Sequence, residues 1–315
     1  MVDFTQHTIN TPYMVGPVHC YSATINGELV LFDTGPPTEE ASSYLEEHID
    51  LDKLRHVIIT HCHIDHYGQA LWLEKRSNAT IYLPYRDSLK ANLHDQRLDG
   101  MYRILESLGF GSAYLNELEK VFYKGASLPP FPLGYRVAEN EIPRSLRVGV
   151  LACPGHSQSD LVYTVDDFVL SGDTLLKGIF QSPLLDVDLE TGERFDNYGA
   201  YCETIVKLSQ LEGMTVLPGH RNNIVGIKET QKFYLSKLLV RVQQLHQYLG
   251  EENVMQLIDK LLNGRMKDIL HIYLKASEIV FMMDLLKDPE RLKNALERSG
   301  LWPEVAELYQ LAVLK

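Results

Sequence analysis

The sequence predicts an α/β layered domain followed by an all-helical C-terminal appendage. Short apolar segments rich in β-branched residues alternate with helical segments through the first two thirds of the chain, which is typical of layered α/β folds. Strand signals stop near residue 226, and helical spacing continues from there. A chain of 315 residues is long enough for one large domain with an appendage. We therefore predict an α/β domain over residues 1–225, with a helical insertion at about 85–147, and a helical domain over residues 226–315.

The first 35 residues are predicted to form strands. Residues 18–25 lead to a turn at Asn26-Gly27, which is the strongest short hairpin signal, and residues 29–32 return. The hairpin ends at Asp33, because Gly and Pro follow it within four residues. Two roles are open for Asp33: a cap for the helix predicted over residues 39–48, or an acceptor that supports a metal-binding histidine.

The next strand, residues 54–60, leads into the most informative motif of the chain, His61-Cys62-His63-Ile64-Asp65-His66. Four potential metal ligands fall within these six residues. Three imidazoles and a carboxylate at the end of a buried strand would repel one another and lose hydration unless a cation held them. We therefore predict a metal site here, with the cysteine of the motif pointing to the opposite face from its two neighbours.

A helical insertion interrupts the alternation of strands and helices. The alternation first continues with a helix over residues 68–76 and a strand over residues 79–84. Within residues 85–147, apolar spacing then predicts helices over residues 86–108 and 114–123. Since this insertion separates two segments that carry ligand-type residues, we expect it to overhang the site.

Three later strand ends each present one ligand-type residue in a turn that contains glycine. These turns are Pro154-Gly155-His156, Gly172-Asp173-Thr174 and Pro218-Gly219-His220. They follow strands predicted over residues 146–153, 168–171 and 215–217. One such turn is a weak signal, but four strand ends that deliver ligands favour a single shared site.

Five helices are predicted after residue 226. They cover residues 228–248, 251–262, 267–287, 289–298 and 303–314. The third is apolar around most of its circumference, so it must be buried, either under its neighbours or in a homodimer interface formed by the C-terminal helices.

Charge and composition narrow the classes of function. With 30 Lys and Arg residues against 42 Asp and Glu residues, the formal net charge is −12, which disfavours binding to nucleic acid. The N-terminus lacks the basic flank and apolar core of a signal peptide, and no apolar run approaches about 18 residues. We therefore expect a cytoplasmic protein without membrane association, and its four cysteines, which form no CxxC pair, are expected to be reduced.

These motifs resemble those of the metallo-β-lactamase superfamily, and within it the glyoxalase II-like hydrolases. Together with Leu31-Phe32-Asp33-Thr34-Gly35, they occur in the family's order between residues 18 and 220. The resemblance implies a four-layer αβ/βα sandwich with metals at one edge of two facing sheets. The long insertion and the helical tail look more like the quinolone-signal response thioesterase branch, and the glutathione-anchoring residues of glyoxalase II are not found.

The resemblance also implies a centre with two divalent metal ions. The implied ligands are His61, His63 and His156 for the first metal, Asp65, His66 and His220 for the second, and Asp173 for both. Seven ligands are too many for one tetrahedral ion and suit two ions that share a carboxylate and a hydroxide. We expect zinc, with iron and manganese as alternatives, because all three accept His and carboxylate ligands. Arg221, where many members have glycine, would place a cation beside the site.

The predicted function is that of a metal-dependent hydrolase. A metal-bound hydroxide would attack a thioester or ester carbonyl of a small acyl substrate, and Asp65 would orient it and shuttle its proton. Three alternatives stay open: a phosphodiesterase, a mononuclear-iron persulfide dioxygenase, and a regulatory protein that acts through its helical tail.

Overall fold

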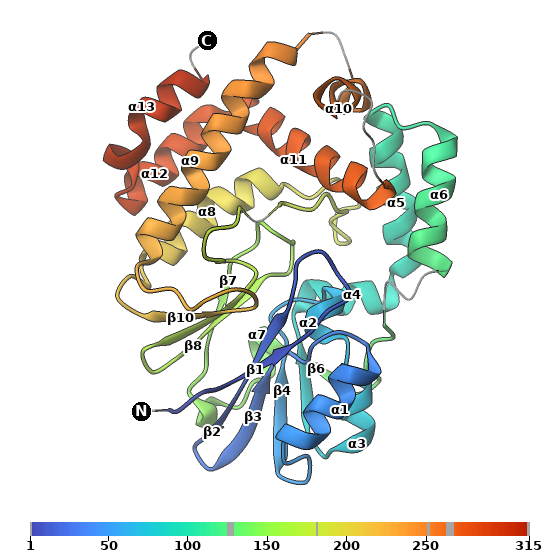
Figure 1. Cartoon of the computed structure of the whole chain (residues 1–315), viewed down its shortest axis with the longest axis vertical. Helices are drawn as coiled ribbons and strands as arrows, with labels where there is room; N and C mark the ends of the chain where they lie inside the picture. The colour runs from blue at the N-terminus through green and yellow to red at the C-terminus, as the bar shows by residue number, and fades with distance from the viewer. Residues whose placement is uncertain (1, 125–128, 181, 251–252, 263–267, 314–315) are drawn as a thin grey trace.

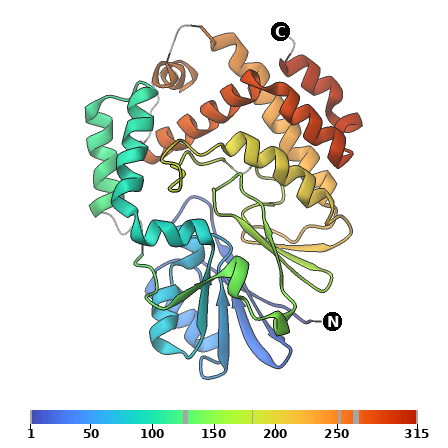
Figure 2. The same cartoon turned by 180° about the vertical axis from the view of Figure 1, so that it is seen from behind.

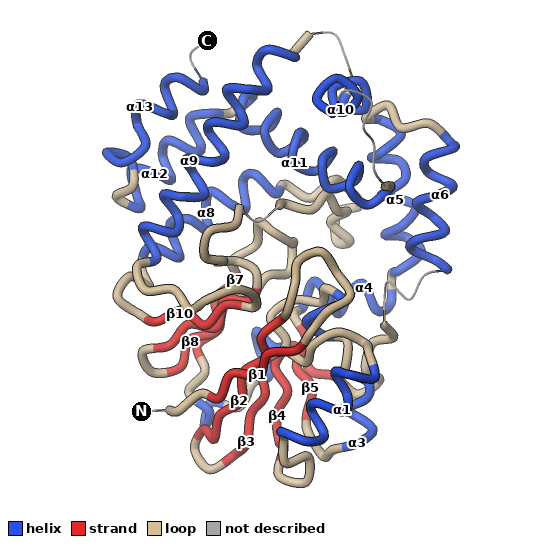
Figure 3. The backbone as a smooth tube through the Cα atoms, in the orientation of Figure 1, coloured by secondary structure: helices blue, strands red, loops and turns tan. Residues whose placement is uncertain are grey.

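The structure, a computed structural model, describes residues 2–124, 129–180, 182–250, 253–262 and 268–313. Two β-sheets face each other in the lower half of Figure 1, and most of the helices gather above them. Figure 3 shows the same separation, with strands in red below and helices in blue above. The ligand-bearing strand ends lie between these two halves.

The first sheet contains six strands in the order β1-β2-β3-β4-β5-β6. Their bounds are β1 Thr5–Ile9, β2 Val18–Ile25, β3 Glu28–Phe32, β4 Leu54–Ile58, β5 Thr80–Leu83 and β6 Tyr135–Val137. The first three strands pair antiparallel, and β3 to β6 pair parallel. Asn26 and Gly27 join β2 to β3 with φ values of 51° and 85°, as a two-residue type I′ turn requires. The predicted hairpin is therefore confirmed.

The second sheet contains four strands in the order β10-β9-β8-β7. Their bounds are β7 Gly149–Ala152, β8 Leu161–Val165, β9 Phe168–Gly172 and β10 Thr215–Pro218. β8 runs antiparallel to both β7 and β9, whereas β10 runs parallel to β9. As a result, β7, β9 and β10 all end at the same edge of this sheet.

Three apolar clusters define four layers. Leu31 of β3 belongs to a cluster with helices α1 (Glu39–His48) and α3 (Ala70–Arg76), whereas its neighbour Phe32 belongs to a cluster between the two sheets. This alternation follows from the two-residue period of a strand. On the far side, helices α8 (Asn197–Ser209) and α9 (Ile227–Leu245) cover the second sheet. The order helix, sheet, sheet, helix is the predicted sandwich.

The remaining long helices form a helical layer over the sandwich. They are α4 Tyr85–Asn92, α5 His94–Ser107, α6 Ser112–Lys124, α10 Val254–Leu262, α11 Ile269–Lys287, α12 Pro289–Ser299 and α13 Trp302–Val313. One apolar cluster joins Leu105 of α5, Leu238 of α9 and Ile279 of α11, so the insertion and the tail pack together. In Figures 1 and 2 the insertion helices α5 and α6 lie beside one end of α11.

Helix α11 is buried within the chain. Ten of its residues are buried, and they face α6, α8, α9, α10 and α12. This packing accounts for its apolar circumference, because the neighbouring helices cover nearly all of its surface. A homodimer through the C-terminal helices stays a prediction, as does the division of the chain into domains at residue 226.

The structure differs from the prediction mainly in the insertion. The helix predicted over residues 86–108 is divided at Leu93 into α4 and α5, and only α5 contributes residues to the apolar cluster of the helical layer. Strand β6 was not predicted, since three residues are too few to show alternation. Two short helices, α7 Ala138–Glu141 and the 3-10 turn Arg144–Leu146, precede β7. A second 3-10 turn, His246–Tyr248, extends α9.

Some predicted features lie outside the described residues, namely the helix starts at Glu251 and Lys267 and the helix end at Leu314. Among the helices that are described, none combines the length and apolar character needed to cross a membrane. All four cysteines are buried and none forms a disulfide, as predicted.

Candidate metal centre

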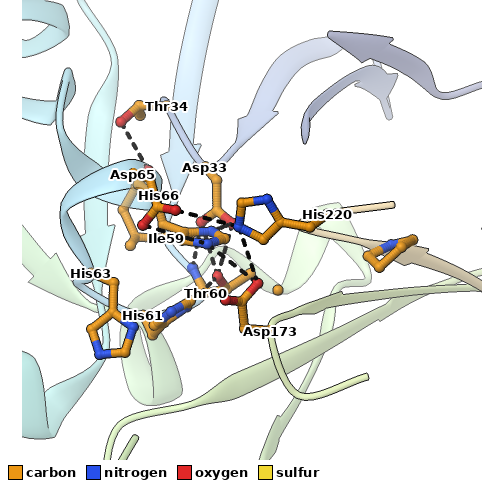
Figure 4. A network of polar contacts seen from close by, with 12 residues as sticks. Asp33, Thr34, Ile59, Thr60, His61, His63, Asp65, His66, Asp173 and His220 are labelled. Carbon is orange, nitrogen blue, oxygen red and sulfur yellow. Dashed lines mark hydrogen bonds and ion pairs between the residues drawn. The ribbon is translucent and has the colours of Figure 1, made fainter. Parts of the chain in front are cut away.

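The seven predicted ligands meet at the edge where the strands end. Each lies just beyond a strand or in the short helix that follows it. The positions are His61, His63, Asp65 and His66 after β4, His156 after β7, Asp173 after β9 and His220 after β10. Asp65 and His66 belong to helix α2 (Ile64–Tyr67), which begins directly after His63. Figure 4 shows Asp65, His66, Asp173 and His220 pointing toward one another.

The ligand atoms form three overlapping groups, and within each group they lie within 4.8 Å of one another. The groups are His61, His63 and His156; His61, His66 and Asp173; and Asp65, His66 and His220. The first and third groups are the sets that the resemblance implied for the two metals. The second group shares a histidine with each of them and adds the aspartate that was implied as the bridge.

Hydrogen bonds on the outer nitrogens orient three of the histidine rings. The Nδ1–H groups of His66, His156 and His220 donate to Oδ2 of Asp33 (2.8 Å), the carbonyl of Ser182 (2.8 Å) and the carbonyl of Pro17 (2.7 Å), respectively. A neutral imidazole that donates from Nδ1 carries its lone pair on Nε2. In all three rings Nε2 faces Asp173, so each ring in its neutral form would aim this lone pair where a metal would lie.

His61 is oriented through a hydroxyl. The hydroxyl of Thr60 donates to Oδ2 of Asp33 at 2.8 Å, so its oxygen accepts from Nδ1–H of His61 at 3.1 Å. His63 instead faces its neighbours through Nδ1, which lies 3.0 Å from Nε2 of His156. Two nitrogen lone pairs this close suit a shared cation.

Several buried ligand atoms have no hydrogen-bond partner among the described residues. They are Nε2 of His61, His66 and His220, and Oδ1 of Asp173. Because buried polar atoms are nearly always paired, these four atoms indicate a bound group that is not protein. Nitrogen and carboxylate donors in groups of three fit divalent metal ions. The residues present therefore fit a two-metal centre.

Two of the rings are neutral. Burial, with help from the charges of neighbouring histidines, lowers the pKa of His61 well below its ordinary value. Burial likewise lowers the pKa of His63 to about 3, followed by the charges of His156 and Lys90. Both rings therefore keep their lone pairs available at neutral pH.

The two acids make the other side of the centre attractive to positive charge. Burial alone would lower the pKa of His66, but the charges of Asp173 and Asp65 hold it well above its ordinary value. Burial alone would raise the pKa of Asp173, but the charges of His66 and His220 hold it far below its usual range. Asp173 is thus stabilised in its ionised form by positive charge, which a divalent cation supplies.

Asp33 is the acceptor for His66, a predicted ligand, and does not cap helix α1. Thr38, not Asp33, caps helix α1, because its hydroxyl oxygen accepts from the backbone N–H of Ala41 at 3.2 Å. Asp33 instead accepts from His66 and from Thr60, whose backbone N–H lies 2.8 Å from Oδ1. Its backbone has a φ of 57°, which an aspartate tolerates better than most residues.

Two hydrogen bonds that hold the turn around His220 were not predicted from the sequence. The start of β2 holds the turn around His220: Tyr21 donates to the carbonyl of Pro218 (2.8 Å), and Nε2–H of His19 donates to the carbonyl of Arg221 (2.7 Å). A histidine within a strand gives no sequence signal for such a contact. The side chain of Arg221 is exposed, and its role as a cation beside the site stays a prediction.

Comparison with known proteins agrees with this geometry. Residues 13–220 match a family described as the metallo-beta-lactamase superfamily. A Bacillus subtilis (strain 168) protein described as probable metallo-hydrolase YqjP is 25% identical in an alignment of 318 positions, which covers 93% of this chain and 95% of that protein.

Solved structures show the same fold. The metallo-beta-lactamase family protein TTHA1429 from Thermus thermophilus superimposes with a TM-score of 0.71 at 20% identity, covering 91% of this chain and 94% of that one. A beta-lactamase domain protein from Burkholderia ambifaria gives a TM-score of 0.74 at 20% identity, with 90% and 86% covered. The glyoxalase II-like branch stays a prediction. Because the family match spans more than half of its residues, the chain belongs to the metallo-beta-lactamase superfamily.

Proposed function

We propose that the protein is a binuclear metal-dependent hydrolase that cleaves a thioester or an ester of a small acyl substrate. The position of Asp173 carries the proposal. Its Oδ1 lies 3.4 Å from Nε2 of His66 and 3.6 Å from Nε2 of His220, whereas its Oδ2 lies 3.8 Å from Nε2 of His156. The two oxygens thus face different ligand sets, which supports a bridging carboxylate between two metals.

Two divalent ions held by these groups would supply an activated water at neutral pH and a Lewis acid for the acyl oxygen. Asp65 is placed to handle the proton: its Oδ2 lies 3.3 Å from Nε2 of His220 and its Oδ1 lies 4.0 Å from Nε2 of His66. Burial alone would raise the pKa of Asp65, but the positive charges of His66 and His220 hold it below its ordinary value. Asp65 is therefore ionised at neutral pH, and we assign it the role of accepting a proton from the attacking water and returning it to the leaving thiolate or alkoxide.

The surroundings of the centre favour a small substrate with apolar parts. A net charge of −12 opposes polyanions such as nucleic acid. Met14 is exposed on the loop before β2, whose Pro17 carbonyl accepts the hydrogen bond from the ring of His220. Val225 is exposed on the loop that follows His220. These exposed apolar side chains support a substrate that carries an acyl group.

The test combines metal analysis with a substrate panel. We expect about two equivalents of zinc, iron or manganese per chain, and hydrolysis of a short chromogenic ester or thioester in preference to a lactone or a phosphodiester. Asp173→Asn should abolish turnover and lower the metal content, whereas Asp167→Asn, in the exposed turn between β8 and β9, should leave both unchanged. One equivalent of iron with oxygen consumption would instead indicate a dioxygenase, and preferential phosphodiester cleavage would indicate a phosphodiesterase.

A further inference from the structure

A buried ion cluster lies next to the metal centre but supplies none of its ligands. Nζ of Lys90 lies 2.8 Å from Oδ1 of Asp87 and 3.4 Å from Oδ2 of Asp186, and the three side chains are 8%, 0% and 7% exposed. Arg97 completes the cluster, with its Nε 2.7 Å from Oδ1 of Asp186. Two cations thus balance two carboxylates. Lys90 and Arg97 come from helices α4 and α5 of the insertion.

The first carboxylate of the cluster holds the ligand-bearing turn after β4. Oδ2 of Asp87 accepts a hydrogen bond of 2.6 Å from the backbone N–H of Cys62. Cys62 separates His61 from His63, so this bond fixes the peptide between two ligands of the first group. A charged acceptor makes a strong bond to a backbone N–H.

The second carboxylate, Asp186, holds the segment that supports His156, the third ligand of the first group. Asp186 follows Ser182 by four residues, and the carbonyl of Ser182 orients the ring of His156. In addition, the backbone N–H of Leu184 donates to the carbonyl of His156 at 2.9 Å. Gln158, two residues after that histidine, donates from Nε2 to Oδ2 of Asp186 at 2.9 Å. Lys90 therefore links Asp87, which holds the turn after β4, to Asp186, which holds the segment beside His156. Both of these segments position ligands of the first group.

Stability alone does not explain such a cluster. Burying four charges carries a large desolvation cost, and well-packed apolar residues often serve a fold as well or better. In some proteins, buried ion pairs instead fix the relative geometry of the groups that they connect. At this place, that geometry is the relative position of the β4 turn and the segment beside His156.

We propose that Lys90 is a positioning residue that fixes His61, His63 and His156 relative to one another by pairing with both Asp87 and Asp186. The inference rests on the proposed metal-dependent function and deepens it, because it assigns the insertion a role in assembling the first metal group. The third group, Asp65, His66 and His220, is held by Asp33 and Pro17 instead, so it does not depend on Lys90.

The test measures zinc binding to purified full-length protein by competition with a chromogenic chelator. Lys90→Met keeps the length of the side chain but removes its charge, and it should weaken one zinc-binding step by about 10- to 100-fold, as loss of a group that supports a ligand typically does. The other step should stay within about twofold of the wild type, and kcat should fall without a matching rise in KM. Lys232→Met, which removes an exposed partner of Glu304, serves as the control and should change neither step.

Asp87→Asn provides an independent variant, because the amide keeps an acceptor for Cys62 but loses the charge that pairs with Lys90. It should weaken the same step. Two unchanged zinc-binding steps in folded Lys90→Met would overturn the proposal. If circular dichroism shows that Lys90→Met does not fold, the zinc-binding steps of Asp87→Asn decide instead. Failure of both variants to fold would overturn the positioning role in favour of a structural one. A wild-type protein that binds one equivalent contradicts the binuclear function, and the role of Lys90 is then decided on that single step.

Discussion

At the scale of single residues, one carboxylate supports two ligands. Asp33 accepts directly from His66 and reaches His61 through the hydroxyl of Thr60. Asp33→Asn should lower zinc affinity by about 10- to 100-fold, because an amide cannot accept at both positions and offers a donor where His66 needs an acceptor. Chelator competition measures the effect, and Asp99→Asn on the exposed face of α5 is the matched control. Equal affinities in the two variants would contradict this role.

Asp65 is the residue on which turnover should depend most. Replacing Asp65 with Asn keeps the size of the side chain but removes the proton acceptor, so kcat should fall by about 100- to 10,000-fold, the usual contribution of a general base. The measurement is kcat at matched metal content, with the content of each sample determined by elemental analysis. Near-normal turnover in a variant that holds its full metal content would exclude Asp65 from proton transfer.

At the scale of elements, the turns after the strands leave no room for side chains. A Cβ on Gly219, between β10 and His220, would lie 2.5 Å from Cε1 of His66 and 2.9 Å from Oδ1 of Asp173. Gly219→Ala should therefore displace ligands of the centre and lower kcat by about 100-fold, as a shift of about 1 Å at a reacting centre can do. Gly111→Ala, where a Cβ would meet nothing within 4 Å, is the control. Equal rates in the two variants would show that the turn adjusts without cost.

The burial of α11 can be tested within the helix itself. Ile279 is 0% exposed at the centre of the helical cluster, so Ile279→Ala should lower the free energy of unfolding by about 2 to 5 kcal/mol. Leu270→Ala, at a position 44% exposed, should change it by less than about 0.5 kcal/mol. Urea unfolding of both variants measures the difference. A small loss at Ile279 would mean that this part of the helical layer is loosely packed.

At the scale of the whole molecule, local features were predictable and contacts distant in sequence were not. The hairpin at Asn26-Gly27 and the strand ends that carry ligands follow from short patterns, and so does helix α1, which has the predicted bounds. The break at Leu93 carries no Pro or Gly and depends on how α4 and α5 pack against different partners. The pairing of Lys90 with Asp186 spans 96 positions and leaves no local signal, so the sequence alone could not predict it.

The stability of the whole chain in acid should depend on a histidine that is not a candidate metal ligand. His7 of β1 is buried, and its Nε2 lies 2.8 Å from Oγ of Ser22. Burial, followed by the charge of His48, lowers the pKa of His7 from 6.5 to about 4. Between these two values the unfolded chain binds a proton that the folded chain does not, so the free energy of unfolding is fully retained above pH 6.5 and declines as the pH falls toward about 4.

His7→Gln removes this titration while keeping a group that can hydrogen-bond to Ser22. The urea midpoint of the metal-free variant should therefore decline less steeply than that of the metal-free wild type between pH 6.5 and pH 4, whereas the two curves should run parallel from pH 6.5 to pH 8. The comparison isolates His7, because every other titrating group is shared by the two proteins. Curves that stay parallel down to pH 4 would mean that His7 takes up its proton equally readily in the folded and unfolded chains. The acid sensitivity would then come from other groups with a lowered pKa, such as His63 and Asp186.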